Sequence, residues 1–407
     1  MSRPIGSKNK AKQQKIFNVE LQKQVEGSPI TRDNTLLKIA NWGSQNLYPQ
    51  DLLGLYQNSP THHSCVDFAV RSIVGEGVDY DAMAIDGTQL RPNYLQTWDE
   101  LLESLALDFI LYGSYAIEVI RNRDGKTFSL YHIPLEEVRW GLYDEDGTIP
   151  YYYVSTDWSS VSQNPPIQIQ ALEQLDANNI KSGKPYLYVY KKYSPTNRYY
   201  TSPHYAAAIK AIQSEIEYVN WDIKHISNGF SSMGVLTLPP VETEQEKLQI
   251  VDNIQRMFTG SENANTLMIN FSNGLSEEGV TWTPFNSGDN GADEYVAAND
   301  RCINRIMTAH QIPSRMLIGL PSDNAGFNSE AALLESAYML YNKLIGNANR
   351  KAIVSTINQM FAIQGIEVEI QLKPLSFLDD AANQGTDNDA VDTAQNTNDS
   401  NVEEVEE

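Results

Sequence analysis

A long helix with a single narrow apolar stripe is the feature that most constrains this fold. Between Tyr205 and Gly229, apolar side chains recur at alternating spacings of three and four residues. They are Ile209, Ile212, Ile216, Val219, Ile223 and Ile226, followed by Phe230. This heptad pattern predicts a helix whose stripe packs against a partner helix. Ser202 as N-cap, Pro203 at the first helical position and Asn228-Gly229 at the end predict a length of about 26 residues, or roughly 39 Å.

A second long helix is predicted from Asp293 to Gln311, with Pro313 ending it. The segment between the two helices has the pattern of strand, helix, strand and strand. These elements are predicted at 234–238, 243–258, 267–271 and 280–283. The sequence therefore predicts a pair of long helices with a β-α-β-β unit inserted between them.

The rest of the chain predicts an antiparallel sheet packed on helices, which makes the fold class α+β. Helices are expected at 61–74 and 98–111, and strands at 115–121, 127–132, 138–143, 151–154 and 186–192, with turns at Asp124-Gly125 and Asp146-Gly147. Residues 155–184 are rich in Ser, Gln, Asn and Pro and predict a long loop. After a loop at 317–329, a helical stretch to Met360 is followed by an alternating segment, 366–372, that predicts a half-buried strand.

The charge is uneven along the 407 residues, which are enough for two to three domains. Residues 1–39 are expected to form a basic, flexible N-terminal arm. Residues 378–407 hold ten acidic side chains and no Lys or Arg, and predict a disordered acidic tail. The net charge of −22 leaves the body acidic as well. Tight binding of nucleic acid by a broad basic face is therefore disfavoured, whereas weak contact with passing DNA is compatible with this charge.

The local signatures of a P-loop ATPase, a dinucleotide-binding enzyme and an α/β-hydrolase are absent from the sequence. If energy is consumed, another protein consumes it. Cys65 and Cys302 lie far apart, so neither a disulfide framework nor a cysteine zinc site is expected. There is no apolar stretch typical of a signal peptide or a membrane span. We expect no cofactor, no catalytic residue and no membrane partner.

Two motifs have metal-binding alternatives. His62 and His63 stand beside Cys65, but adjacent residues on a helix point about 100° apart and no second ligand group has a defined spacing, so surface histidines and a core cysteine are favoured. Asp144-Glu145-Asp146-Gly147 resembles the start of a calcium loop, but Ser155 stands where that loop needs a glutamate, which favours a hairpin turn. We expect no metal site.

Three stretches, in this order and spacing, resemble the portal proteins of tailed bacteriophages. They are LYGSYAIEVI at Leu111–Ile120, HISNGFSSMGVLTL at His225–Leu238 and IMTAHQIPSRMLIG at Ile306–Gly319. The resemblance covers residues 40–375. It implies a wing domain in two parts, 40–202 and 313–377, a stem of two helices, 203–231 and 291–312, and a clip, 232–290. Within the second wing part it implies a tunnel loop, 318–329, followed by a long helix.

The resemblance also implies a function. Portal proteins look like rings of twelve subunits at one capsid vertex, where double-stranded DNA enters during packaging and leaves during ejection. The implied partners are further copies of the chain, the DNA, the terminase large subunit, the head-tail connector and the major capsid protein, in the virion. The tunnel loop that would touch DNA comprises Asp323, Asn324, Ala325, Gly326, Phe327 and Asn328. The stem would pack through Ile209, Ile212, Ile216, Val219, Ile223 and Ile226.

Two alternatives stay open from the residues alone. Another structural or adaptor protein of the phage would share the setting but would lack the order of stem, clip and stem. A metal-dependent nuclease or other hydrolase would use His62, His63 and nearby carboxylates.

Overall fold

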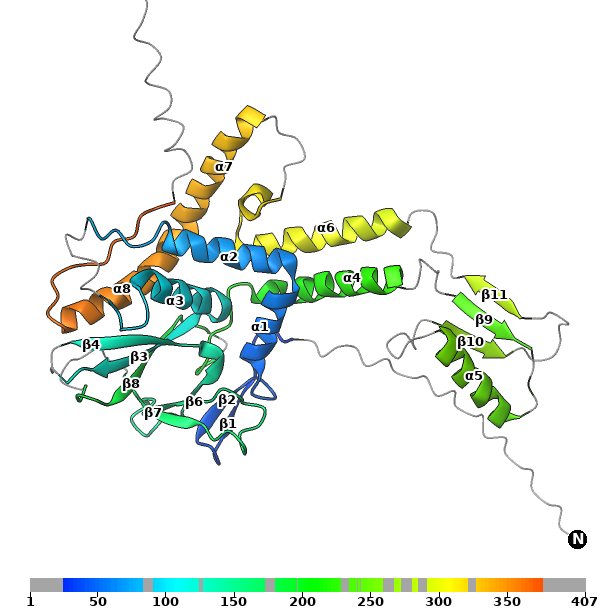
Figure 1. The fold of residues 1–407 in the computed structure, drawn as a ribbon, viewed down its shortest axis with the longest axis horizontal. Coiled ribbons are helices and arrows are strands. Elements are labelled where there is room, and N and C mark those ends of the chain that lie inside the picture. The colour runs from blue at the N-terminus through cyan, green and yellow to red at the C-terminus, as the bar shows by residue number, and fades with distance from the viewer. Residues whose placement is uncertain are drawn as a thin grey trace, which may run out of the picture.

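The computed structural model describes residues 25–82, 91–123, 127–172, 180–195, 197–227, 234–239, 241, 243–258, 267–271, 280–284, 291–320 and 327–375. These residues form a body of a six-stranded sheet, a two-stranded hairpin and several helices, from which two long helices extend to a separate small unit (Figure 1). The predicted α+β class is confirmed.

The body is built on a six-stranded sheet with the strand order β4-β3-β8-β7-β6-β5. All neighbouring strands pair antiparallel except β7 and β8, which are parallel. The strands are β3 (Ser114–Arg121), β4 (Phe128–Ile133), β5 (Val138–Trp140), β6 (Tyr151–Val154), β7 (Ile167–Ala171) and β8 (Pro185–Lys191). A 3-10 turn, η1 (Leu135–Glu137), joins β4 to β5.

Helices α1 (Tyr48–Asn58), α2 (Pro60–Val74) and α3 (Trp98–Tyr112) pack on one another, and α3 lies against β3 and β4. Their ends follow local chemistry. Ser59 caps α2, while Thr97 and Glu100 form a reciprocal capping box on α3. Gly113 ends α3 in the left-handed region, at φ 73°, where a side chain would also collide with Thr201.

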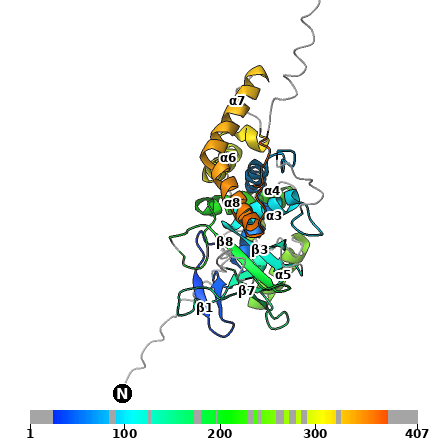
Figure 2. The same ribbon diagram turned by 90° about the vertical axis from the view of Figure 1, so that its left-hand side faces the viewer.

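The last helices of the body are α7 (Phe327–Tyr341) and α8 (Asn347–Ile363), joined by a π-helical turn, η5 (Asn342–Gly346). Figure 2 shows α7 pointing away from the sheet. By contrast, α8 is fixed to the sheet, because the Tyr115 hydroxyl on β3 bonds Thr356 at 2.7 Å and donates to the Ala352 carbonyl at 3.1 Å. A 3-10 turn, η4 (Arg315–Ile318), precedes this part.

The small unit lies between helices α4 (Ile209–Ser227) and α6 (Gly291–His310). It contains β9 (Gly234–Leu238), α5 (Glu244–Phe258), β10 (Leu267–Phe271) and β11 (Thr281–Pro284). In its sheet, β9 is central, parallel to β10 and antiparallel to β11. The predicted order of strand, helix, strand and strand is confirmed, with boundaries within one residue.

The prediction of a flexible N-terminal arm over residues 1–39 is wrong from Thr31 onward. Strands β1 (Thr31–Asn34) and β2 (Ile39–Trp42) form a hairpin, and Trp42 is fully buried. Its ring stacks on Tyr200 at 4.2 Å between centroids and meets Trp140 edge-on at 5.4 Å. The anchoring partners lie more than 90 residues away, so the local composition gave no sign of them.

Three further local predictions need correction. The expected loop 155–184 contains β7, in which Ile167 and Ile169 alternate with Gln168 and Gln170. The expected strand 138–143 ends at Trp140. Beyond it, residues 141–143 have no regular strand pairing and form only an isolated bridge, from Gly141 to Ile39. Residues 366–372 are not a strand: a bridge from Leu372 to Val78 is their only pairing among the described residues, and the Ile370 amide donates to the Asn358 side chain instead.

Candidate functional site: the helical arm and its root

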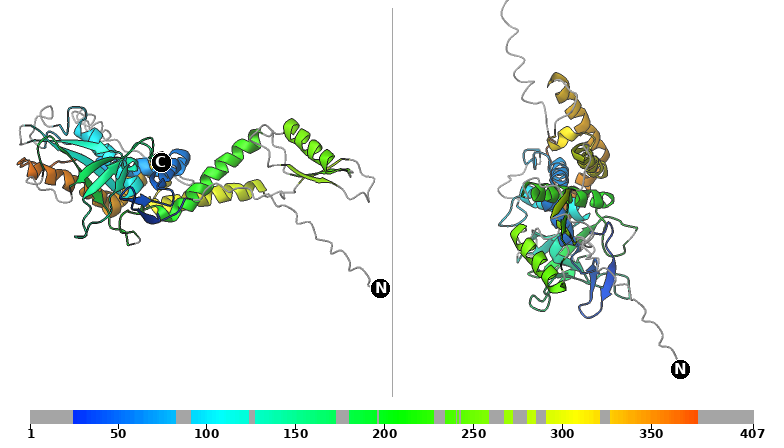
Figure 3. Two further views of the ribbon diagram at one scale, coloured as in Figure 1. Left: turned by 90° about the horizontal axis from the view of Figure 1, so that it is seen from below. Right: turned by 90° about the vertical axis from the view of Figure 1, so that its right-hand side faces the viewer.

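Helices α4 and α6, which we call the arm, carry the small unit away from the body. The chain leaves the body along α4 and returns along α6, so the two helices are antiparallel (Figure 1). Seen from below, they meet at the body and diverge toward the unit (Figure 3). No described helix is long and apolar enough to cross a membrane.

The first predicted helix begins later than expected. A 3-10 turn, η3 (Ala206–Ala208), precedes α4 at Ile209. Ser202 and Pro203 therefore do not cap the helix, and the Ser202 hydroxyl instead donates to Ser28 at 3.2 Å. The predicted end at Asn228-Gly229 lies outside the described residues. The second long helix covers nearly the predicted span.

The apolar stripe on α4 changes from buried to exposed along the helix. Ile209 and Ile212 are buried in the body, and Ile216 is half-buried. Val219 is 40% exposed and Ile223 57% exposed. The exposed fraction rises along α4 toward the end where α4 and α6 diverge (Figure 3). Ile226 lies in α4, but its side chain is outside the described set. A packing role for the outer positions stays a prediction.

At the root of the arm, the first turn of α2 holds α4 through a carboxylate. Glu215 is only 5% exposed, and its two oxygens accept hydrogen bonds from the hydroxyls of Ser59 and Thr61. Ser59 is also the N-cap of α2, because its hydroxyl accepts from the His62 amide at 3.2 Å. A carboxylate at this position faces the positive end of the α2 dipole, which stabilises its negative charge.

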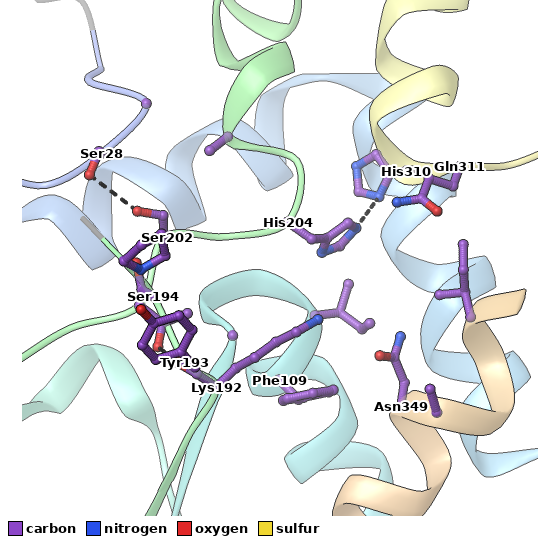
Figure 4. A pocket seen from close by; sticks show the side chains of 18 of the residues that line it. Ser28, Phe109, Lys192, Tyr193, Ser194, Ser202, His204, His310, Gln311 and Asn349 are labelled. Carbon is purple, nitrogen blue, oxygen red and sulfur yellow. Dashed lines mark hydrogen bonds between the residues drawn. The ribbon is translucent and has the colours of Figure 1, made fainter. Parts of the chain in front are cut away.

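The same turn of α2 holds α6 through histidines. His62 Nδ1 lies 2.9 Å from His310 Nε2, and His310 Nδ1 lies 3.1 Å from His204 Nε2. We call His62, His310 and His204 the histidine chain. The Tyr205 ring stacks on His310 with centroids 5.2 Å apart. His62 and His310 are buried, and His204 opens onto a neighbouring cleft (Figure 4).

Burial keeps the two inner imidazoles neutral. It lowers the pKa of His62 to about 3, with smaller effects from His204 and His63. The pKa of His310 is lowered well below its ordinary value by burial and then by His204 and His62. Each neutral imidazole has one N–H donor and one acceptor nitrogen, so the position of the proton on one ring determines its position on the next ring. Adding a further proton to these buried rings is unfavourable.

The structure separates the two residues of the metal-site alternative. His62 belongs to the histidine chain, whereas His63 faces outward, 3.4 Å from Asp67. Within the described part of the chain, no group of three His, Cys, Asp or Glu side chains is placed to hold a metal ion. The segment at Asp144 forms the predicted turn, closed by a bond from the Gly147 amide to the Asp144 carbonyl.

The predicted tunnel loop falls mostly outside the described residues, at Asp323, Asn324, Ala325 and Gly326. Helix α7 begins at Phe327, so Phe327 and Asn328 stand in its first turn rather than in the loop. The side chains of these two residues are likewise not described.

Sequence reasoning did not single out Glu215, His204 or His310. A signal existed for His310, which stands three residues after Met307 on the apolar side of its helix, where a polar residue needs a buried partner. Glu215 directly precedes Ile216 of the stripe and carries a similar signal. Neither signal could name the partners, which lie on α2.

Two solved structures from gene transfer agent particles share the fold of this chain. The chain matches one in "Virion of native gene transfer agent (GTA) particle" with 17% identity and a TM-score of 0.52, covering 80% of this chain and 83% of that one. It matches another in "Neck of native GTA particle computed with C12 symmetry" with 18% identity, a TM-score of 0.51 and coverage of 80% and 84%. A phage portal protein of the HK97 family from Corynebacterium diphtheriae has 11% identity, a TM-score of 0.45 and coverage of 84% and 98%.

Comparison with curated proteins gave no significant match. The model of the family described as "Phage portal protein" matches residues 72–388, which include most of the body, the arm and the small unit. The chain therefore belongs to the phage portal protein family.

Proposed function

We propose that this chain is the subunit of a ring at one vertex of a phage capsid, through which double-stranded DNA is packaged and later ejected. The observation that carries the proposal is the arm: its outer apolar stripe is exposed in the single chain, and a neighbouring subunit would bury it. The symmetry named for the gene transfer agent neck supports a ring of twelve.

We assign the parts as the resemblance implies. The arm would be the stem, the small unit the clip, and the body the wing, with its first part at 40–202 and its second at 313–377. The tunnel loop at Asp323–Asn328 would contact DNA. The acidic net charge of −22 suits a conduit, because tight neutralisation of phosphates would hold the DNA in place.

We further propose that terminase, and then the head-tail connector, dock at the small unit, and that the major capsid protein contacts the body. The sequence has no P-loop, so the energy for packaging would come from the terminase. On this proposal the chain acts as a structural protein of the virion.

Native mass by light scattering, followed by negative-stain imaging of the same fraction, tests the ring. Twelve chains of 45.7 kDa give a particle of about 0.55 MDa with a central hole. A stable monomer or dimer, both alone and with purified capsid protein present, would contradict the proposal.

A further inference from the structure

A cleft of about 540 Å³ opens beside the histidine chain, where the arm joins the body (Figure 4). Five parts of the fold form its wall: Gly27 and Ser28, the end of α3, residues 192–195 and 201–206, the end of α6, and the junction of η5 with α8. No Asp or Glu is among the described residues that line it, although the chain carries 52 acidic residues. The electrostatic character of this wall is therefore opposite to that of the whole chain.

Hydrogen-bond donors converge on the cleft. The Lys192 side chain extends into it, and its ammonium has no acidic partner among the described residues (Figure 4). Asn349 approaches from α8. Gln311 lies at the rim with a φ of 58°, in the left-handed region that a glutamine seldom adopts. Lysine and side-chain amides are common ligands of anionic groups.

The histidine chain adds a further donor. His62 Nε2 is buried and has no partner in the described structure. A buried N–H without an acceptor is the rarer and costlier arrangement, so we assign this nitrogen as the bare one. His62 Nδ1–H then donates to His310 Nε2, and His310 Nδ1–H donates to His204 Nε2. With three neutral rings, this direction leaves the proton of His204 on Nδ1, where no hydrogen bond within the described protein uses it.

We propose that this cleft binds a small oxyanion, a phosphate or a carboxylate, held by the Lys192 ammonium, His204 Nδ1–H and the side-chain amides of Gln311 and Asn349. Because the chain has a net charge of −22, it repels anions except where nearby hydrogen-bond donors and positive charge outweigh that repulsion. The wall of the cleft meets this condition, because no Asp or Glu is among its described residues. Free phosphate and the carboxylates of residues 378–407 are two sources of the same chemistry.

An anion at this place would act on the root of the arm. His204 precedes α4 by five residues and bonds to His310, the last residue of α6. A negative charge beside His204 Nδ1–H polarises the histidine chain in the assigned direction and strengthens its hydrogen bonds. Binding would therefore raise the thermal midpoint of the full-length protein.

Calorimetric titration of the full-length protein at pH 7 and low salt tests the proposal. One titration uses sodium phosphate and a second uses a synthetic peptide of residues 396–407. Each is repeated with Lys192→Gln, the variant expected to lose binding. Lys184→Gln is the matched control, because Lys184 is an exposed lysine just before the opposite end of β8. We expect one ligand per chain and at least a tenfold weaker affinity in Lys192→Gln only. Lys192→Arg, which keeps the charge, should restore most of the affinity.

Binding of phosphate alone would identify a free anion as the ligand, and binding of the peptide alone would identify a protein carboxylate. The proposal is overturned if neither ligand binds, or if both lysine variants weaken binding equally, since that indicates diffuse attraction. Asn349→Ala gives a second measurement that does not change the net charge, and it should weaken binding without altering the circular dichroism spectrum. Unchanged affinity in both Lys192→Gln and Asn349→Ala would also overturn it.

Discussion

His62 and His310 bond to each other through Nδ1 and Nε2 at 2.9 Å, although 248 positions separate them in the sequence. The contact joins the first turn of α2 to the last residue of α6. The neighbouring contact of Glu215 with Ser59 and Thr61 joins the same turn of α2 to α4. One turn of one helix therefore fixes the inner ends of both long helices.

Burial of His62 makes stability depend on acidity. The folded pKa of His62 is about 3, below its ordinary value of 6.5, so the unfolded chain takes up a proton that the folded chain does not. The stabilisation is complete above pH 6.5 and is lost as the pH falls from 6.5 toward 3. We expect the free energy of unfolding to fall by up to about 1.4 kcal/mol per pH unit for this residue. Urea unfolding at several pH values, in wild type and in His62→Gln, measures the slope.

His63→Gln is the matched control for that measurement, because His63 is adjacent in sequence and its side chain is half exposed. The slope of His62→Gln should be shallower than the slopes of wild type and of His63→Gln, because both of these proteins still contain the buried imidazole. Equal slopes in wild type and His62→Gln would show that burial of this imidazole does not control the acid response.

Glu215→Gln should weaken the other contact of the root. The amide keeps the shape of the side chain but replaces one of the two oxygens that accept hydrogen bonds from Ser59 and Thr61. It also removes the negative charge that faces the α2 dipole. We expect a loss of about 1.5–3 kcal/mol in the free energy of unfolding, measured by urea titration. Glu217→Gln, on the exposed side of α4, should change stability by less than about 0.5 kcal/mol. A loss of the same size in both variants would argue against a special role of Glu215.

Substitutions in the outer part of the stripe should affect ring assembly without affecting the folding of the single chain. Val219→Ser and Ile223→Ser change exposed side chains, so each should alter the stability of the single chain by less than about 0.5 kcal/mol. If a neighbouring subunit covers the stripe, the same variants should reduce the fraction of protein in rings, measured by light scattering. Ile212→Ala, in the buried part, should instead destabilise the chain by about 2–5 kcal/mol. Full ring yield in the double serine variant would remove the stripe from the interface.

Replacing residues 321–326 with a Gly-Ser linker of the same length tests the proposed DNA contact. Because this segment would touch DNA rather than neighbouring subunits, ring mass should stay at the wild-type value while packaging of DNA into capsids decreases. Packaging yield is measured as nuclease-protected DNA per particle. An unchanged yield with intact rings would refute the assignment of the loop.

The sequence predicts elements well where the information is local. The heptad stripe and the turn residues located both long helices and the inserted unit, since period and breakers depend only on near neighbours. The segment 366–372 alternates as a strand should, but a strand also needs a neighbouring strand, and Asn358 takes the amide of Ile370 instead. Local alternation alone cannot report that competition.

The site needed information that no local pattern contains. The histidine chain joins His62, His204 and His310 from three distant segments, and the spacing of its members has no characteristic value. The hairpin of β1 and β2 is a similar case, because Trp42 is anchored by Trp140 and Tyr200. Such contacts depend on the tertiary fold, which sequence periodicity does not specify.

In chain order the inserted unit lies between α4 and α6, so a tilt of the arm about its contacts with the first turn of α2 would displace the end of the arm that faces the unit. From Glu215, where α4 contacts that turn, to its last residue Ser227, the helix rises by about 18 Å at 1.5 Å per residue. A tilt of about 5° at Glu215 would move the outer end of α4 by roughly 1.6 Å, less than a third of one helical turn. A small rearrangement among His62, His310 and Glu215 would therefore become a larger displacement of the outer end of α4.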